Sequence, residues 1–139
     1  MFLNGMKNKK GFTLIELVIV IVIIAILAAI LVPSLLKWVD KSKDTNMISA
    51  AKTVKDCITA EIAEMYKAGE ELGADETAYD AEFWEQVSKD ANTTVTNDSS
   101  KNGYVKFTVE NDSLKTFSYT KDGKTATMKE NGSFEVTAN

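Results

Sequence analysis

The sequence predicts an α+β protein in which a long amino-terminal helix packs on an antiparallel sheet of about four strands. Three observations support this prediction. Phe12 to Val32 is almost wholly apolar, a one-sided apolar pattern follows from Leu35 to Met65, and four short strand-like runs separated by turn residues fill residues 103–139. The chain has 139 residues, which is room for one domain with a modest core.

Residues 12–33 are predicted to form the first part of the helix. Of the 21 residues from Phe12 to Val32, 16 are Phe, Leu, Ile or Val, three are Ala, and only Thr13 and Glu16 are polar. As a helix this run is about 31 Å long, which matches a bilayer core of about 30 Å. The aliphatic side chains outweigh the cost of inserting one acid. We therefore expect a transmembrane helix.

Three interpretations of the apolar run compete: a cleaved secretory signal, a plain membrane anchor, and a helix that inserts first and later packs against copies of itself. The length of the run and the lack of Ala-x-Ala near its end disfavour the secretory signal. Three lysines lie on each side of the run, namely Lys7, Lys9 and Lys10 before it and Lys37, Lys41 and Lys43 after it. Only the chain's own amine and the short first segment favour a cytoplasmic amino terminus.

Glu16 is the one acid in the apolar run, and two explanations for it are open. It lies near a helix start, where free N–H groups and the helix dipole favour an anion. Alternatively, a cut after Gly11 would leave an amine on Phe12, four residues before Glu16. Between two staggered helices that amine and carboxylate pair well, and such a pair would set the register of a polymer.

Residues 10–18, KGFTLIELV, resemble the prepilin signature of type IV pilins, and the match is close from Lys7 to about Pro33. The resemblance implies that residues 1–11 are a basic leader peptide. A membrane prepilin peptidase would cleave it between Gly11 and Phe12 and then N-methylate Phe12. The resemblance also implies that Glu16 pairs with the Phe12 amine of a neighbouring subunit during assembly.

The resemblance further implies where the chain resides and what it contacts. We expect a single-pass protein of the cytoplasmic membrane, N-in and C-out, which an assembly ATPase and a membrane platform protein extract into a helical homopolymer. The final location would be an extracellular pilus on the cell surface, a structure that such families use for adhesion and motility. A minor pilin or pseudopilin of a secretion or DNA-uptake system is the alternative, and a membrane-anchored extracytoplasmic binding domain is another.

Pro33 is expected to kink the helix, because proline removes a backbone hydrogen bond and its ring clashes with the carbonyl of residue 29. A helix stop or the first residue of a second helix would also explain it. The resemblance implies a kink here, and a loss of helical order over residues 25–33 in the assembled filament.

Residues 34–69 are predicted to form an amphipathic helix of a globular head. Its apolar positions recur at helical spacing, although the polar stretch KSKDTN at residues 41–46 interrupts them, and Gly69 is the expected helix end. These positions include Met47, Ile48, Ala51, Val54, Ile58, Ile62 and Met65. We expect this stripe to pack on the sheet.

Residues 70–102 are predicted to be a connecting loop with one short helix from Ala81 to Lys89, capped by Thr77 or Asp80. Phe83, Trp84 and Val87 are its expected apolar contacts. Asp75, Glu76 and Asp80 are expected in a solvated acidic loop rather than a cation site, so no metal ligand is assigned.

Residues 103–139 are predicted to form an antiparallel meander with strands at 104–110, 114–120, 124–130 and 133–137. The pairs Asn111-Asp112, Asp122-Gly123 and Asn131-Gly132 supply the turns. The inward faces carry Val105, Phe107, Val109, Phe117, Tyr119, Ala126, Met128, Phe134 and Val136. Many pilins close this region with a disulfide, but the chain has one cysteine, so it resembles the pilins of Gram-positive bacteria that lack that bridge.

Composition argues against an enzyme and against a nucleic-acid partner. The chain has no histidine, its single Cys57 lacks an activating base and is expected to be a half-buried apolar residue, and no phosphate loop occurs. We therefore assign no catalytic residue and no cofactor. Without residues 1–11 the net charge changes from −4 to −7, which disfavours binding to nucleic acid.

Overall fold

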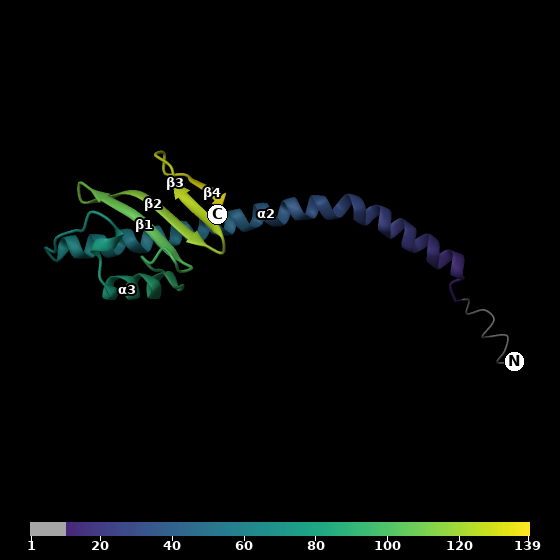
Figure 1. The fold of residues 1–139 in the computed structure, drawn as a ribbon, viewed down its shortest axis with the longest axis horizontal. Helices are drawn as coiled ribbons and strands as arrows, with labels where there is room; N and C mark the ends of the chain where they lie inside the picture. The colour runs from purple at the N-terminus through teal and green to yellow at the C-terminus, as the bar shows by residue number, and fades with distance from the viewer. Residues whose placement is uncertain (1–10) are drawn as a thin grey trace. The chain divides into compact units, whose positions relative to one another are not determined.

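The computed structural model describes residues 11–139, so of the predicted leader only Gly11 lies within the described residues. The chain divides into two compact units, one ending at Lys41 and one comprising Ser42–Asn139, which we call the head. The elements in chain order are α2 (Leu14–Lys67), the 3₁₀ helix η1 (Glu76–Ala78), α3 (Ala81–Ala91), β1 (Tyr104–Glu110), β2 (Ser113–Lys121), β3 (Lys124–Met128) and β4 (Phe134–Ala138) (Figure 1).

Helix α2 is continuous over 54 residues and passes through both Pro33 and the polar stretch at residues 41–46. The polar stretch contains lysine and aspartate but no glycine or proline, so it can remain helical. Gly69 ends the helix as predicted: its φ is +79°, its N–H donates to Tyr66 O (3.1 Å), and the N–H of Glu70 donates to Met65 O (3.0 Å). These two bonds form a Schellman motif.

Within the head, α2 buries one apolar stripe, which confirms the predicted face. The buried residues are Met47, Ala51, Val54, Ile58 and Ile62, at steps of three or four, and Met65 packs beside them. Cys57 lies at the edge of the stripe and is half-buried, as expected.

The four strands form one antiparallel sheet in the order β1-β2-β3-β4, which confirms the predicted meander. One row of paired residues crosses the sheet from Val105 through Tyr119 and Ala126 to Val136. Asn111 and Asp112 both have positive φ, as do Asp122 and Gly123, which is the conformation that two-residue hairpin turns need. The predicted strand limits differ from those observed by at most two residues.

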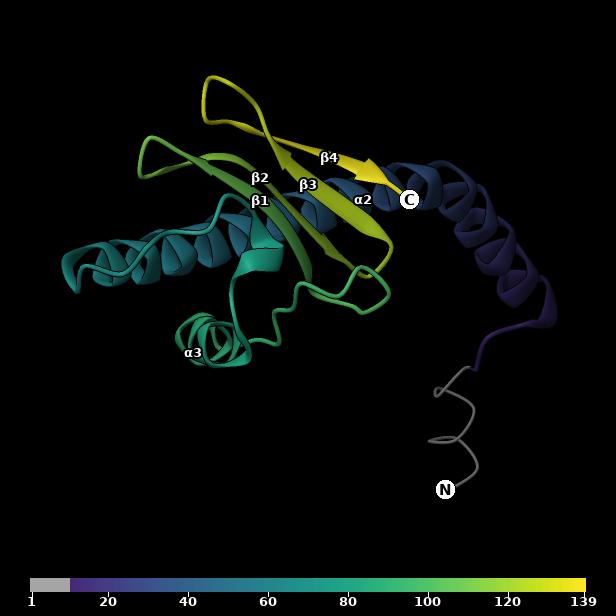
Figure 2. The same ribbon diagram turned by 60° about the vertical axis from the view of Figure 1, so that its left-hand side comes forward.

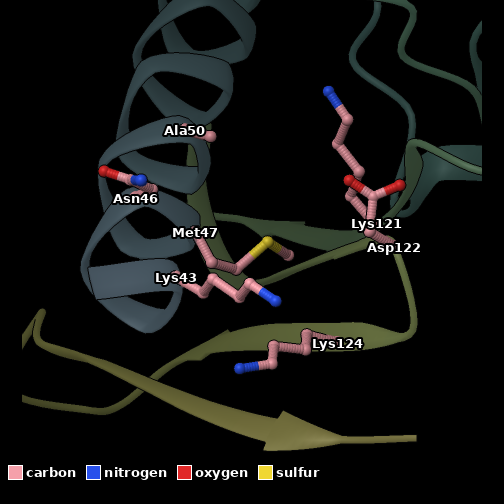
Figure 3. Close-up of a pocket in the computed structure, with 7 residues that line it drawn as sticks. All are labelled: Lys43, Asn46, Met47, Ala50, Lys121, Asp122 and Lys124. Atoms are coloured by element: carbon pink, nitrogen blue, oxygen red, sulfur yellow. The ribbon is translucent and has the colours of Figure 1, made fainter. Parts of the chain in front are cut away.

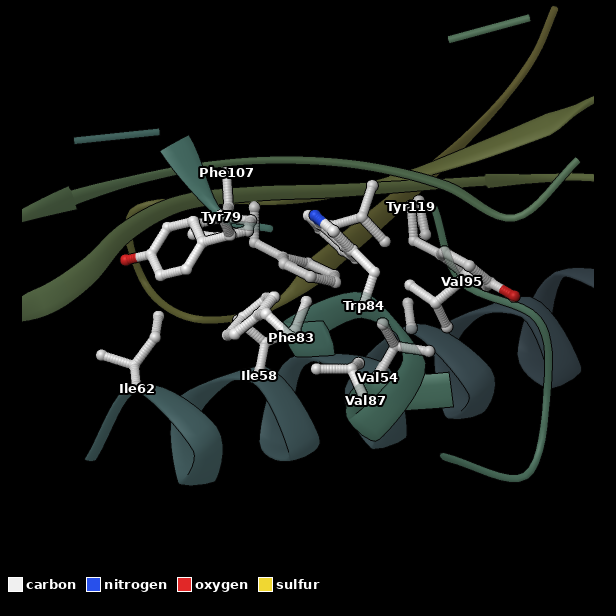
Figure 4. Packing of buried hydrophobic residues seen from close by; sticks show 14 of the residues in the cluster. Val54, Ile58, Ile62, Tyr79, Phe83, Trp84, Val87, Val95, Phe107 and Tyr119 are labelled. Carbon is white, nitrogen blue, oxygen red and sulfur yellow. The ribbon is translucent and has the colours of Figure 1, made fainter. Parts of the chain in front are cut away.

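The core of the head lies between one face of the sheet and the two helices, α2 and α3 (Figures 1 and 2). Figure 4 shows Phe83 and Trp84 of α3 pointing at Phe107 of β1. The ring centroids of Phe83 and Trp84 lie 6.4 and 6.0 Å from that of Phe107. Such contacts contribute beyond area burial, and they fix α3 against the sheet. Phe83, Trp84 and Val87, the predicted apolar contacts of this helix, are all buried.

The connector between α2 and the sheet contains the 3₁₀ helix η1, which the sequence analysis missed. Asp75 caps η1, accepting from Thr77 N. Asp80, one of the two predicted candidates, caps α3 and accepts from Phe83 N at 3.0 Å. The expectation of a solvated acidic loop is wrong for Glu76, which is 6% exposed. Its Oε2 accepts from Phe107 N (3.2 Å) and its Oε1 from the Tyr104 hydroxyl (3.3 Å), so backbone and side-chain donors of β1 take the place of water.

Candidate functional site

The amino-terminal end of α2 is organised by a reciprocal pair of hydrogen bonds. The N–H of Glu16 donates to Thr13 Oγ1 at 3.2 Å, and the N–H of Thr13 donates to Glu16 Oε2 at 3.1 Å. This is a capping box, in which two side chains satisfy N–H groups that a helix start leaves open. One Glu16 oxygen is therefore engaged locally. Among residues 11–139, its other oxygen, Oε1, forms no hydrogen bond or ion pair.

Gly11 and Phe12 precede this box and lie outside the helix. Both are exposed, Phe12 at 83%, and apart from the adjacent residues no atom of the described chain lies within 4 Å of the position a Cβ on Gly11 would take. The helix begins at Leu14, and the carbonyl of Thr13 accepts from Leu17 N, so within residues 11–139 the peptide bond between Gly11 and Phe12 precedes the helix. Gly11, Phe12 and Glu16 thus lie together within six residues. Pro33 lies 17 residues beyond Glu16, about 26 Å along the helix, and forms no part of this site.

The apolar run that follows the box is exposed along its length. Every Leu, Ile and Val from Leu14 to Val32 is at least 43% exposed, and this stretch of α2 is long and apolar enough to cross a membrane. An uncovered apolar surface of this extent marks contact with lipid or with other chains. The first unit thus presents a surface that requires an apolar environment.

Trp38 lies at the polar end of the apolar helix. Its side chain is 68% exposed, and the Lys41 ammonium lies 5.9 Å from the ring centroid. Tryptophan and lysine at the end of an apolar helix are typical of the membrane–water interface. The sequence analysis had not assigned Trp38 a role, although its position six residues after Val32 was a signal.

The acids and the cysteine of the head bear on whether it can hold a metal ion or supply a thiol nucleophile. Among residues 11–139, no group of three or more Cys, Asp or Glu side chains has the geometry to hold a metal ion. Burial raises the pKa of the Cys57 thiol, and the charges of Asp90 and then Asp56 raise it further. A raised pKa lowers the thiolate fraction, so Cys57 is a poor nucleophile.

The comparisons with known proteins bear on the first unit. Residues 6–32 match a family model described as the prokaryotic N-terminal methylation motif. The chain carries the type IV prepilin signature. No curated protein and no solved structure matches the chain at a significant level.

The prepilin signature and the fold agree with each other. A long amino-terminal helix followed by a four-stranded antiparallel sheet is the layout of the type IV pilin fold. The motif marks a substrate of prepilin peptidase and of the pilus assembly machinery, and it belongs to pilin-type structural proteins rather than to an enzyme family. The single apolar helix fits membrane anchoring.

Proposed function

We propose that this chain is a structural subunit of a type IV pilus that polymerises through its first helix. The leader would be removed between Gly11 and Phe12, and Phe12 would be N-methylated. Glu16 would then pair with the Phe12 amine of a neighbouring subunit. A methylated amine is still a cation, so the pair keeps its charge complementarity in an apolar filament core.

The arrangement at Glu16 is the observation that carries the proposal. The capping box uses Oε2 and leaves Oε1 available, so one carboxylate can both hold its own helix start and accept from a second chain. A glutamine would close the same box, and the helix dipole favours a charge here by only about 0.3–1 kcal/mol. A pairing with the amine of a second chain gives the charge a stronger role.

Before assembly, the first helix would span the cytoplasmic membrane with its amino terminus inside. Glu16 and Trp38 are 22 residues apart, about 33 Å along a helix, and a bilayer core is about 30 Å thick. Both side chains can therefore reach the headgroup regions at once. Glu16 would meet an apolar environment only when the helix leaves the membrane and packs among its copies.

Two substitutions separate the charge of Glu16 from its capping role. Glu16→Gln keeps the box and removes the charge, while Thr13→Ala removes the box and keeps the charge. We expect Glu16→Gln to insert in the membrane but to yield few sheared filaments, and Thr13→Ala to assemble. Filament yield, measured with intact mass of the surface protein, tests this.

The wild-type surface protein should begin at N-methylated Phe12. An uncleaved amino terminus, or filaments formed equally well by wild type and Glu16→Gln, would contradict the proposal. Assembly lost in Thr13→Ala but retained in Glu16→Gln would show that capping is the only role of the carboxylate.

A further inference from the structure

The head has a pocket lined by lysines where α2 faces the turn between β2 and β3. The pocket has a volume of about 550 Å³. Lys43 of α2 and Lys124 of β3 point into it from opposite walls (Figure 3). Lys121 and Asp122 line the far side, so three cations face a single anion on the lining.

Some charged side chains around this pocket have hydrogen-bond or ion-pair partners within residues 11–139, and one does not. Lys124 forms an ion pair with Asp44, and Lys121 Nζ donates to Thr93 Oγ1 at 3.3 Å. The Asp122 carboxylate accepts from the Asn102 side-chain amide at 3.0 Å. Lys43 is exposed and makes none of the ion pairs or hydrogen bonds found among residues 11–139. The pocket therefore offers a cation to an incoming anion.

The opposite charge is concentrated in a different part of the same head. Residues 56–90 contain eleven acids and two lysines, which gives a net charge of −9. The rest of the head, residues 42–55 and 91–139, contains nine lysines and seven acids, which gives a net charge of +2. Within the acidic part, Glu61, Glu70, Asp80 and Glu82 line a second pocket of about 280 Å³.

The acids around Glu61 lie close enough to affect one another. Burial raises the pKa of Glu61, and the charges of four further acids, Glu64, Asp90, Glu70 and Glu82, raise it further. A nearby cation would relieve this repulsion. The acidic pocket is thus electrostatically complementary to the lysine pocket.

The two pockets cannot meet within one chain. Lys43 and Glu61 both lie on α2, 18 residues and about 27 Å apart along the helix. Two different, complementary patches on each copy produce a head-to-tail contact, which builds an open filament when the rotation between copies does not close a ring. A contact between identical patches would instead stop at a dimer.

We propose that the lysine pocket of one head binds the acidic pocket of the next copy of this chain. Lys43 would contact the carboxylates of Glu61 and Glu82. The inference rests on the proposed filament function and adds a contact between heads to the one between helices. Charge complementarity of this kind determines which surfaces of neighbouring subunits meet and in which register they pack.

Charge exchange in the full chain tests this contact. Lys43→Glu should lower the yield of sheared filaments about fivefold, because a charge pair at a rim contributes about that factor. Glu82→Lys should do the same, and the double variant should restore the yield by exchanging the two signs. Lys115→Glu is the matched control, since it makes the same charge change on an exposed part of β2 outside the pocket, and it should leave the yield unchanged.

A crosslink tests the same contact by distance. In a Cys57→Ser background, Lys43→Cys with Glu82→Cys should give a ladder of disulfide-linked multimers on the cell surface, and either cysteine alone should give none. Filaments without a ladder, or a double charge variant as defective as the single ones, would overturn the head contact while leaving the helix-based polymer intact. A wild type that forms no filaments would instead overturn the proposed function.

Discussion

Glu76 stabilises the head from inside the connector. It is the one charged residue of the described chain that is fully buried, and it accepts hydrogen bonds from Phe107 N and from the Tyr104 hydroxyl. Glu76→Ala should lower the free energy of unfolding by about 1–3 kcal/mol, because a buried N–H loses its acceptor. Urea denaturation measures this. The control Glu135→Ala, at an exposed position of β4, should change the free energy of unfolding by less than about 0.5 kcal/mol. Equal effects of the two substitutions would contradict the role of Glu76.

Glu61 gives the head a predictable dependence on pH. Its pKa is raised in the folded state, first by burial and then by neighbouring acids. Between the ordinary and the raised pKa the folded chain binds more protons than the unfolded chain, so the contribution of Glu61 to stability falls as pH rises through its folded pKa. Glu61→Gln should therefore be more stable than wild type at pH 7. The stability difference between the variant and wild type should shrink towards pH 4, and urea midpoints at pH 7 and pH 4 measure it. A difference that stays constant with pH would contradict the prediction.

Glu76 was missed because its role depends on distant partners. Glu76 lies 31 residues from Phe107, and an acid within a polar stretch gives no periodic signal of burial. The capping box was also not predicted, although the T-x-x-E spacing of Thr13 and Glu16 before an apolar run is a signal for it. Gly11 and Phe12 were identified from the same short stretch, and their processing stays a prediction.

At the scale of elements, Gly103 marks the entry into β1. Its φ is +88°, and a Cβ placed there would lie 2.3 Å from Thr94 O. Gly103→Ala should therefore destabilise the head by more than Gly69→Ala, whose φ is also positive but whose Cβ would meet no atom within 4 Å. For Gly69→Ala we expect about 1 kcal/mol from backbone conformation alone. Thermal unfolding compares the two, and equal losses would show that contact with Thr94 is unimportant.

The strands were predictable because local chemistry decides them. Alternating apolar residues and the pairs Asn111-Asp112 and Asp122-Gly123 fix both strand and turn without distant information. The connector was predicted less well, because η1 has only three residues and depends on caps and on contact with β1. The kink expected at Pro33 stays a prediction. In this structure α2 is helical on both sides of Pro33. The kink angle is best measured in the assembled filament.

For the whole molecule, the depth of Trp38 in a bilayer is the measurable quantity. Trp84→Phe leaves Trp38 as the single tryptophan, and it also removes an indole N–H that has no protein acceptor. In vesicles of brominated lipid, Trp38 fluorescence should be quenched most by bromines near the headgroups, because an interfacial tryptophan lies at that level. Trp38→Phe keeps only Trp84, which is 7% exposed in the head, and should be quenched little. Strongest quenching of Trp38 by bromines at the chain centre would contradict the proposed span.

The connector also determines which border of the sheet remains accessible. Ala74 O accepts from Val109 N at 2.8 Å, and Glu76 accepts from Phe107 N, so the outer side of β1 is occupied by the chain's own polar groups. Unpaired strand borders invite foreign strands and amyloid-like aggregation. In the proposed filament the head would be displayed in many copies at high local concentration, which increases that hazard. The segment at residues 74–76 shields one of the two borders where aggregation could begin.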